Sequence, residues 1–266
     1  VKHHITVTVT DHKKVPQKNL TVIVKGDLEQ SYRDKTDQKG QVTVPEIAQT
    51  ERHGIYIEGY PDGSFGPERG MTRAEAATIF ARLLAEKNGD NISTVARTKF
   101  DDIPAHAWYS GYVKYLNNHG VAYGKTKTTF APDDAITRAE YTALAVRFFE
   151  VYGDGSAEIM EKYKSFDDVS EGDWAASYIQ AAAKYGWVNG YEDGSFHPSR
   201  QITRAEVVTL TNRLLGRSAD EVYVQEHLRQ LNTFHDLSKR HWAYYEVMES
   251  ANAHTAVLGK NETWNK

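Results

Sequence analysis

Three arginines are the residues of this chain best placed for chemistry, because each stands in the same short phrase. The phrase Thr-Arg-Ala-Glu occurs three times, with its arginine at Arg73, Arg138 and Arg204. Its threonine and glutamate predict a capping box at the start of a helix. An arginine in the first turn opposes the helix dipole, so we expect each one to face a negatively charged group.

That negative group has two interpretations. A guanidinium fork beside unpaired amides at a helix start suits a carboxylate ligand, which predicts ligand binding by the three arginines. The alternative is a structural ion pair with an aspartate that also recurs in the chain. On the ligand-binding interpretation, replacing Arg204 by alanine should preserve the fold, since Thr203 and Glu206 still cap the helix.

A second arginine follows each of the first three at a constant interval, at Arg82, Arg147 and Arg213. The interval is about two and a half helical turns, which puts the two arginines on opposite sides of one helix. We therefore predict structural salt bridges for the second set.

A loop with glycine and proline precedes each phrase. Asp62-Gly63 and Asp193-Gly194 are turn sequences in which glycine can adopt positive φ. We assign these four residues to the ligand-binding grooves. They offer too few oxygen atoms for a calcium loop, so the sequence predicts no metal site.

The middle copy departs from this pattern, because it lacks the Asp-Gly turn and has Lys125 where the third copy has Tyr191. A single arginine can hold a carboxylate, but orienting a larger ligand requires further groups around it. We therefore predict a degenerate groove at Arg138. Arg138→Ala should then reduce binding less than the same change at the other two arginines.

A second repeated phrase carries a phenylalanine, an aspartate and a tryptophan, the last at Trp108, Trp174 and Trp242. Two roles are open for the tryptophans. They can be core residues on an apolar helix face, or their rings can stack on a sugar at a groove. We include them among the candidate ligand-binding residues.

The aspartates Asp101-Asp102 and Asp167-Asp168 come in pairs, as in a glycosidase. Only the second aspartate recurs in the third copy, at Asp236. A cap at the start of a helix is therefore the preferred role.

The elements that must position these residues are helices in repeated units. Two units are continuous, 100–149 and 166–215, each a helix, a loop and a helix. The first Arg phrase has no Trp phrase before it and the last Trp phrase has no Arg phrase after it. We therefore predict that 53–84 and 234–264 pair as one split unit. Deleting 234–266 should destabilise the whole repeat region.

The first part of the chain has a different pattern. Apolar and polar residues alternate from Ile5, from Leu20 and around Val42, which is typical of strands. We predict an all-β segment at 1–48, part of an immunoglobulin-like module, and a mainly α domain at 49–266.

The repeats resemble the S-layer homology family of bacterial surface-anchoring modules, through phrases such as Gly190-Tyr-Glu-Asp-Gly-Ser-Phe196 and Ile202-Thr-Arg-Ala-Glu206. The resemblance implies a pseudo-threefold helical bundle whose grooves bind a pyruvylated secondary cell wall polysaccharide. It implies a secreted protein on the cell wall or surface of a Gram-positive bacterium. The alternatives are an enzyme acting on wall glycan and a surface-layer protein that self-associates without binding glycan.

Composition is consistent with this interpretation. The 266 residues are 40% hydrophobic and 26% charged, with a net charge of −4 and no cysteine. These values argue against nucleic-acid binding, disulfides and thiolate metal sites. No apolar run approaches the roughly 20 residues of a membrane span. The sequence has no phosphate loop or His-Glu-x-x-His motif, so no cofactor and no catalytic residue is predicted. We expect a mature or trimmed piece of a longer protein, because the chain starts at Val1.

Overall fold

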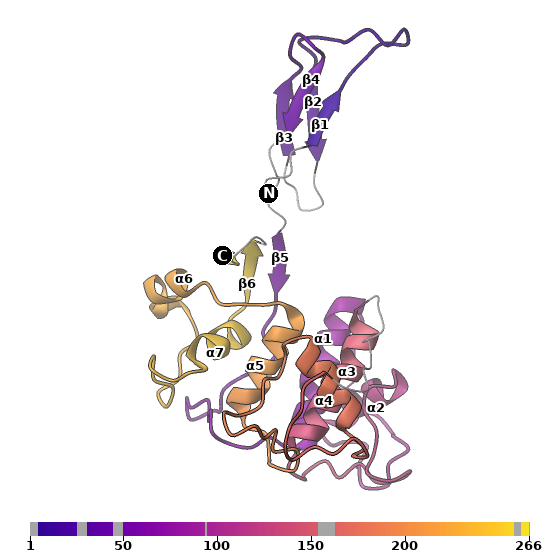
Figure 1. Ribbon diagram of the computed structural model, residues 1–266, viewed down its shortest axis with the longest axis vertical. Helices are drawn as coiled ribbons and strands as arrows, with labels where there is room; N and C mark the ends of the chain where they lie inside the picture. The colour runs from indigo at the N-terminus through magenta and orange to yellow at the C-terminus, as the bar shows by residue number, and fades with distance from the viewer. Residues whose placement is uncertain are drawn as a thin grey trace. The chain divides into compact units, whose positions relative to one another are not determined.

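The computed structural model describes residues 5–25, 31–44, 50–93, 95–153, 163–257 and 262–265. They form two compact units, one of residues 54–253 and one that combines residues up to 53 with residues from 254 onward. The fold is mainly α, as predicted (Figure 1). In the described part of the chain, no helix combines the length and the apolarity that crossing a bilayer requires.

Three long helices form the centre of the 54–253 unit: α1 (Arg73–Asn88), α3 (Arg138–Tyr152) and α5 (Arg204–Leu215). Three shorter ones pack on them in the order α1 with α2 (Ser110–Asn118), α3 with α4 (Ala176–Lys184) and α5 with α7 (Tyr244–Ala251). The connection after α5 holds α6 (Glu221–Glu226) and a short 3-10 turn, Leu228–Gln230. The predicted repeat of a helix, a loop and a helix is therefore present.

Aromatic side chains fill the space between the long helices. The Phe80 ring of α1 lies 4.7 Å from the Phe148 ring and 5.3 Å from the Tyr141 ring, both of α3. The Tyr141 hydroxyl contacts the Thr211 hydroxyl of α5 at 2.7 Å. All three rings are fully buried, and burial raises the pKa of Tyr141 above its ordinary range. Truncating such a ring typically costs about 3–5 kcal/mol.

The starts of the three long helices are joined in a cycle. In each helix the first amide donates to a carbonyl of the next unit's loop: Arg73 N to Asp134 O at 3.0 Å, Arg138 N to Arg200 O at 2.8 Å, and Arg204 N to Arg69 O at 2.9 Å. The second amide of each helix donates in the same way, to the carbonyl of Pro132, Pro198 or Pro67. The third helix thus contacts the loop before the first, which closes the cycle.

The two halves of the predicted split unit meet in the structure. The Asp236 carboxylate accepts the amides of Phe65 and Gly66 at 2.7 and 2.8 Å. The rings of Phe65 and Phe234 lie 5.2 Å apart. Asp102 and Asp168 bind the equivalent loop amides of the continuous units. These contacts support the split unit, while the bounds 53–84 with 234–264, and the division at 48, stay predictions.

The recurring aspartates do not cap helices, contrary to the sequence-based interpretation. The three short helices begin after Tyr109, Ala175 and Ala243, with no side-chain cap. Each aspartate instead accepts hydrogen bonds from backbone amides of a loop that lies far from it in the sequence. That contact depends on tertiary structure and has no signal in the local sequence.

The other unit is built from strands. β1 (Ile5–Thr8) pairs with β4 (Gln41–Val44), and β2 (Thr21–Lys25) pairs with β3 (Ser31–Lys35), all antiparallel. A three-stranded sheet joins β5 (Thr50–His53), β6 (His254–Val257) and β7 (Thr263–Asn265). The strands predicted in 1–48 are confirmed where the chain is described, whereas 1–4, 26–30 and 45–48 lie outside the described residues. The immunoglobulin-like relation stays a prediction.

Candidate functional site

Each Thr-Arg-Ala-Glu phrase forms the predicted capping box. At α5, for example, the Thr203 hydroxyl accepts the Glu206 amide and the Glu206 carboxylate accepts the Thr203 amide at 2.9 Å. The same pair of bonds is present at α1 and α3. The local sequence is therefore sufficient to start these helices.

The helix-start amides are not available to a ligand, which corrects one expectation. The first two amides of each long helix donate to loop carbonyls of the next unit, and the third donates to the capping threonine. An anion at these positions would have to be held by side chains. The sequence could not reveal this, because the loop carbonyls come from the following unit.

The three arginine side chains are buried between units. The exposed fraction is 9% for Arg73 and Arg138 and 4% for Arg204. Each Nε donates to a phenylalanine carbonyl of the next loop, at Phe130, Phe196 and Phe65, over 2.8 to 2.9 Å. Burial lowers the pKa of all three guanidinium groups, although an arginine stays protonated at any physiological pH.

The negative group that Arg73 and Arg138 face is a glutamate. Arg73 Nη1 lies 3.2 Å from Glu140 and Arg138 Nη1 lies 2.9 Å from Glu206, each the capping glutamate of the next helix. The alternative of a pair with a recurring aspartate is therefore wrong for these two. Arg204 donates its Nη2 to the Glu58 carbonyl at 2.6 Å.

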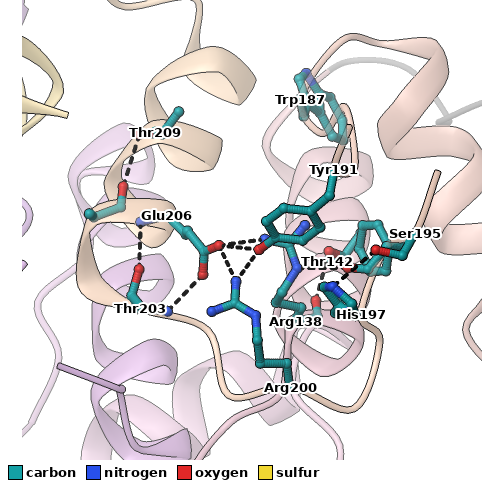
Figure 2. A network of polar contacts seen from close by, with 12 residues as sticks. Arg138, Thr142, Trp187, Tyr191, Ser195, His197, Arg200, Thr203, Glu206 and Thr209 are labelled. Atoms are coloured by element: carbon teal, nitrogen blue, oxygen red, sulfur yellow. Dashed lines mark hydrogen bonds and ion pairs between the residues drawn. The ribbon is translucent and has the colours of Figure 1, made fainter. Parts of the chain in front are cut away.

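Figure 2 shows the network around Arg138, where the Tyr191 ring lies beside the guanidinium and Arg200 also reaches Glu206. The Tyr191 hydroxyl donates to Glu206 at 2.7 Å. Burial opposes the ionisation of Glu206, but the Thr203 amide and the Arg138 charge outweigh it, so the pKa of Glu206 is lowered. This glutamate is therefore charged near neutral pH.

Arg73 and Arg138 each line a groove together with the loop of the following repeat unit, which overturns the assignment of the degenerate loop. Arg73 donates to Tyr123 O at 3.0 Å and contacts the middle unit's loop, whereas Arg138 contacts the complete loop of the third unit at Tyr191. The departing residue Lys125 therefore lies with Arg73. The predicted ranking of the arginines rested on pairing within one unit, and that basis is wrong.

A cavity of about 380 Å³ lies at Arg73, and we call it the Arg73 groove. It is lined by Arg73, Ala77, Ala122, Tyr123, Gly124, Lys125, Phe130, Ile136, Glu140, Leu144, Arg147 and Trp174. Its wall carries three cationic side chains and one carboxylate. These residues come from all three repeat units, so the groove exists only when the repeat units pack together.

An equivalent cavity of about 280 Å³ lies at Arg138, and we call it the Arg138 groove. It is lined by Arg138, Thr142, Trp187, Val188, Asn189, Gly190, Tyr191, Ile202, Glu206, Thr209, Leu210, Arg213 and Trp242. Two cations and one carboxylate face this cavity. Of its two tryptophans, Trp242 comes from the last Trp phrase, as Trp174 of the Arg73 groove comes from the preceding one.

Two arginines of the second set, Arg147 and Arg213, line the grooves, and the sequence reasoning missed them as functional residues. Arg147 lies over the Tyr123 and Tyr178 rings at 4.8 and 4.6 Å, and its Nε donates to the Tyr178 hydroxyl at 3.2 Å. Its two terminal nitrogens make no hydrogen bond to the described residues. Among the pairs formed by described residues, only Arg82 has the predicted salt bridge, at 3.7 Å to Glu58. The sequence did carry a signal for this role, because the second arginine follows the first at the same interval in all three copies.

The three tryptophans are exposed, so the core interpretation is wrong. Trp108 is 54%, Trp174 61% and Trp242 62% exposed. Each stands two positions before the first residue of a short helix, outside the regular face that would bury it. Trp174 and Trp242 line the two grooves.

The Asp-Gly turns form as predicted, and Gly63 lines a separate cavity together with Tyr60 and Phe234. Gly63 and Gly194 have φ of 83° and 84°, a region that glycine adopts without strain. The carboxylates of Asp62 and Asp193 accept the backbone amides of Ser64 and Ser195, each at 2.9 Å. None of the four turn residues lines the Arg73 or Arg138 groove.

Comparison with known proteins identifies the repeats. The family model of the S-layer homology domain matches residues 40–77, 99–142 and 165–208, each of which contains one Thr-Arg-Ala-Glu phrase. The chain belongs to the S-layer homology family. The resemblance seen in the sequence is thereby confirmed.

Several curated proteins share the region. A cellulosome-anchoring protein of Acetivibrio thermocellus is 34% identical over 236 residues, which cover 87% of this chain and 49% of that protein. Cell surface glycoprotein 1 of the same organism is 35% identical over 217 residues, 77% of this chain and 9% of its own length. An amylopullulanase of Thermoanaerobacterium thermosulfurigenes is 30% identical over 194 residues, 73% of this chain but 10% of the enzyme. The chain thus spans half or less of these relatives.

Proposed function

We propose that this chain anchors a protein to the bacterial cell wall, at the cell surface, by binding an anionic glycan. The ligand is a secondary cell wall polysaccharide that carries pyruvate ketals, and the binding is non-covalent. The observation that carries the proposal is the wall of the Arg73 groove, with three cations around one carboxylate. The names of the anchoring and cell-surface relatives support the same role.

The donors that would meet the ligand follow from the contacts already made. Arg73 uses its Nε, Nη1 and Nη2 in bonds to Phe130, Glu140 and Tyr123, so it acts mainly by its charge and by shaping the wall. The two terminal nitrogens of Arg147, which make no hydrogen bond to the described residues, would then be the donors that meet the ligand. A guanidinium with two parallel donors suits the carboxylate of a pyruvate ketal.

The tryptophans supply the second requirement of a glycan site. An indole ring is large and flat, and it can cover the apolar face of a sugar. Trp174 lies at the rim of the Arg73 groove with more than half of its surface exposed. A site with a cationic floor and an aromatic rim fits an anionic sugar better than either group alone.

An enzymatic role is disfavoured by the carboxylates of the grooves. Glycoside hydrolysis commonly uses two carboxyl groups about 5–9.5 Å apart. Among the described lining residues, each groove offers one, Glu140 or Glu206, and each is held by an arginine and by its capping threonine. The match to the amylopullulanase covers too little of that enzyme to carry its activity.

Sedimentation with purified, protein-free walls tests the proposal. The chain should bind intact walls and lose most binding after mild acid removes the pyruvate ketals. Arg147→Ala should weaken binding to a short wall fragment roughly ten- to a hundredfold, the loss of a charge-assisted contact. Short fragments are used because two grooves on one polymer would mask the loss through avidity.

Arg97→Ala is the matched control, since Arg97 is exposed and lines neither groove. Equal binding to intact and acid-treated walls would exclude recognition of the ketal. Assembly into ordered sheets without any wall binding would favour the self-associating alternative. Equal binding by Arg147→Ala and Arg97→Ala would remove the Arg73 groove as the site.

A further inference from the structure

Two histidines and one glutamate meet on the small sheet formed by β5, β6 and β7. His53 and His254 stand directly opposite each other in the antiparallel pair of β5 and β6. Side chains opposite in such a pair project from the same face and touch. Glu262 comes just before β7, which pairs with the other edge of β6.

The three polar groups converge on one point. Glu262 Oε1 lies 3.3 Å from His53 Nδ1 and 3.1 Å from His254 Nε2, and all three groups can offer ligand atoms within 4.8 Å of one another. In a tetrahedral site with metal–ligand bonds of about 2.0–2.1 Å, neighbouring ligand atoms are roughly 3.3 Å apart. One metal ion can therefore contact all three groups with small shifts of the side chains.

The surroundings hold these groups in place. The exposed fraction is 2% for His53, 6% for His254 and 9% for Glu262. The Trp264 ring stacks on His254 at 3.9 Å, and its Nε1 donates to Glu262 Oε1 at 3.2 Å. Outer contacts of this kind fix the orientation of metal ligands. Glu51 lies 3.8 Å from the other ring nitrogen of His53, on the exposed side.

We propose that His53, His254 and Glu262 form a binding site for a divalent transition metal, with Zn²⁺ as the best fit. Two imidazoles and one carboxylate are a ligand set that zinc accepts in tetrahedral geometry, with one further ligand in the fourth position. Imidazole ligands favour zinc and similar ions over calcium or magnesium, which prefer oxygen.

The role of the ion follows from the topology. β5 and β6 pair directly although the whole helical region separates them in the sequence. A clip between segments so far apart removes more chain entropy from the unfolded state than a local one does. The metal would therefore stabilise the pairing that brings together the segments before and after the helical region.

A hydrogen-bonded cluster without metal is the competing interpretation. In that case Glu262 would accept hydrogen bonds from the histidines, and added zinc would not bind at this cluster. The two interpretations separate in a titration of the chelator-treated chain with Zn²⁺ by calorimetry and with Co²⁺ by visible absorption. His3 and His4 are replaced by glutamine in every sample, because adjacent histidines can also bind metal ions.

We expect one ion per chain with a dissociation constant in the micromolar range or below, and tetrahedral Co²⁺ bands. His254→Gln and Glu262→Gln should each weaken binding at least about 100-fold, more than the loss typical of a second-shell change. His12→Gln is the control, since His12 is an exposed histidine of the same unit.

Melting in chelator shows whether the variants still fold. If they do not, NMR of the chain with only His3 and His4 replaced provides the second measurement. Two histidine ring signals should shift with one equivalent of Zn²⁺. The same two signals should shift equally in His12→Gln. The proposal is overturned if zinc binding is not saturable, or if folded His254→Gln binds zinc as tightly as the parent chain. It is also overturned if no histidine signal shifts when zinc is added.

Discussion

Arg204→Ala should destabilise the helical unit, although the capping residues of its helix remain. Arg204 is 4% exposed and donates to Phe65 O at 2.8 Å and to Glu58 O at 2.6 Å. Alanine would leave both carbonyls without these donors at the point where α5 meets the loop before α1. The sequence-based expectation that this variant preserves the fold is therefore replaced by a prediction of loss.

The magnitude can be worked from these two bonds. Each hydrogen bond to a charged group contributes about 1.5–3 kcal/mol. Removing the arginine also relieves the cost of burying its charge, which returns part of the sum. We expect a net loss of about 3–4 kcal/mol. For a unit of this size, 1 kcal/mol corresponds to a shift of about 2–4 °C in the melting temperature, so the midpoint should fall by about 10 °C.

Urea unfolding followed by the helical circular dichroism signal measures this loss. Arg204→Lys should recover little, because an ammonium lacks the fork that reaches two carbonyls. Arg97→Ala, an exposed arginine in the same unit, should change stability by less than about 0.5 kcal/mol. If Arg204→Ala unfolds at the same urea concentration as Arg97→Ala, the Arg204 side chain does not stabilise the contact between α5 and the first loop.

Three further predictions concern the split unit, acid and the grooves. Asp236→Ala should cost about as much unfolding free energy as Asp168→Ala, roughly 1–2 kcal/mol each because both sites are partly solvated; a much smaller loss at Asp236 would contradict equivalent units. The Phe65 and Gly66 amides outweigh the burial of Asp236 and lower its pKa. Its stabilisation is therefore present above the unfolded pKa of about 3.9 and lost as pH falls through the lower folded value, which an acid titration of Asp236→Asn against the parent chain measures. Trp174→Ala should weaken binding of a wall fragment about tenfold without changing the melting temperature, and unchanged affinity would exclude stacking.

Local structure was accessible from the sequence because its causes are local. A capping box needs a threonine and a glutamate three positions apart, and all three predicted boxes are present. Alternation of apolar residues likewise predicted the strands near the start of the chain. The family could also be recognised, since its phrases recur with fixed spacing inside a single chain.

The composition of the grooves depended on tertiary structure. The sequence paired each arginine with the loop of its own unit, whereas the folded chain pairs Arg73 with the loop at Lys125 and Arg138 with the loop at Tyr191. The sequence could not decide whether the tryptophans are buried or exposed. Each one stands only two positions before its helix begins, and this small offset places it outside the buried helix face. These outcomes are set by how units pack, and no spacing within one unit records that.

The sequence by itself determined the long helices with their capping boxes, the strands near the start of the chain and the family of this protein, because each rests on short patterns of neighbouring residues. Only the tertiary structure decided that the helix-start amides are occupied, that Arg147 lines a groove and that His53 meets His254. These contacts join residues from different units or from segments far apart in the sequence. Their energies depend on distance in space, and a linear pattern carries no measure of that distance.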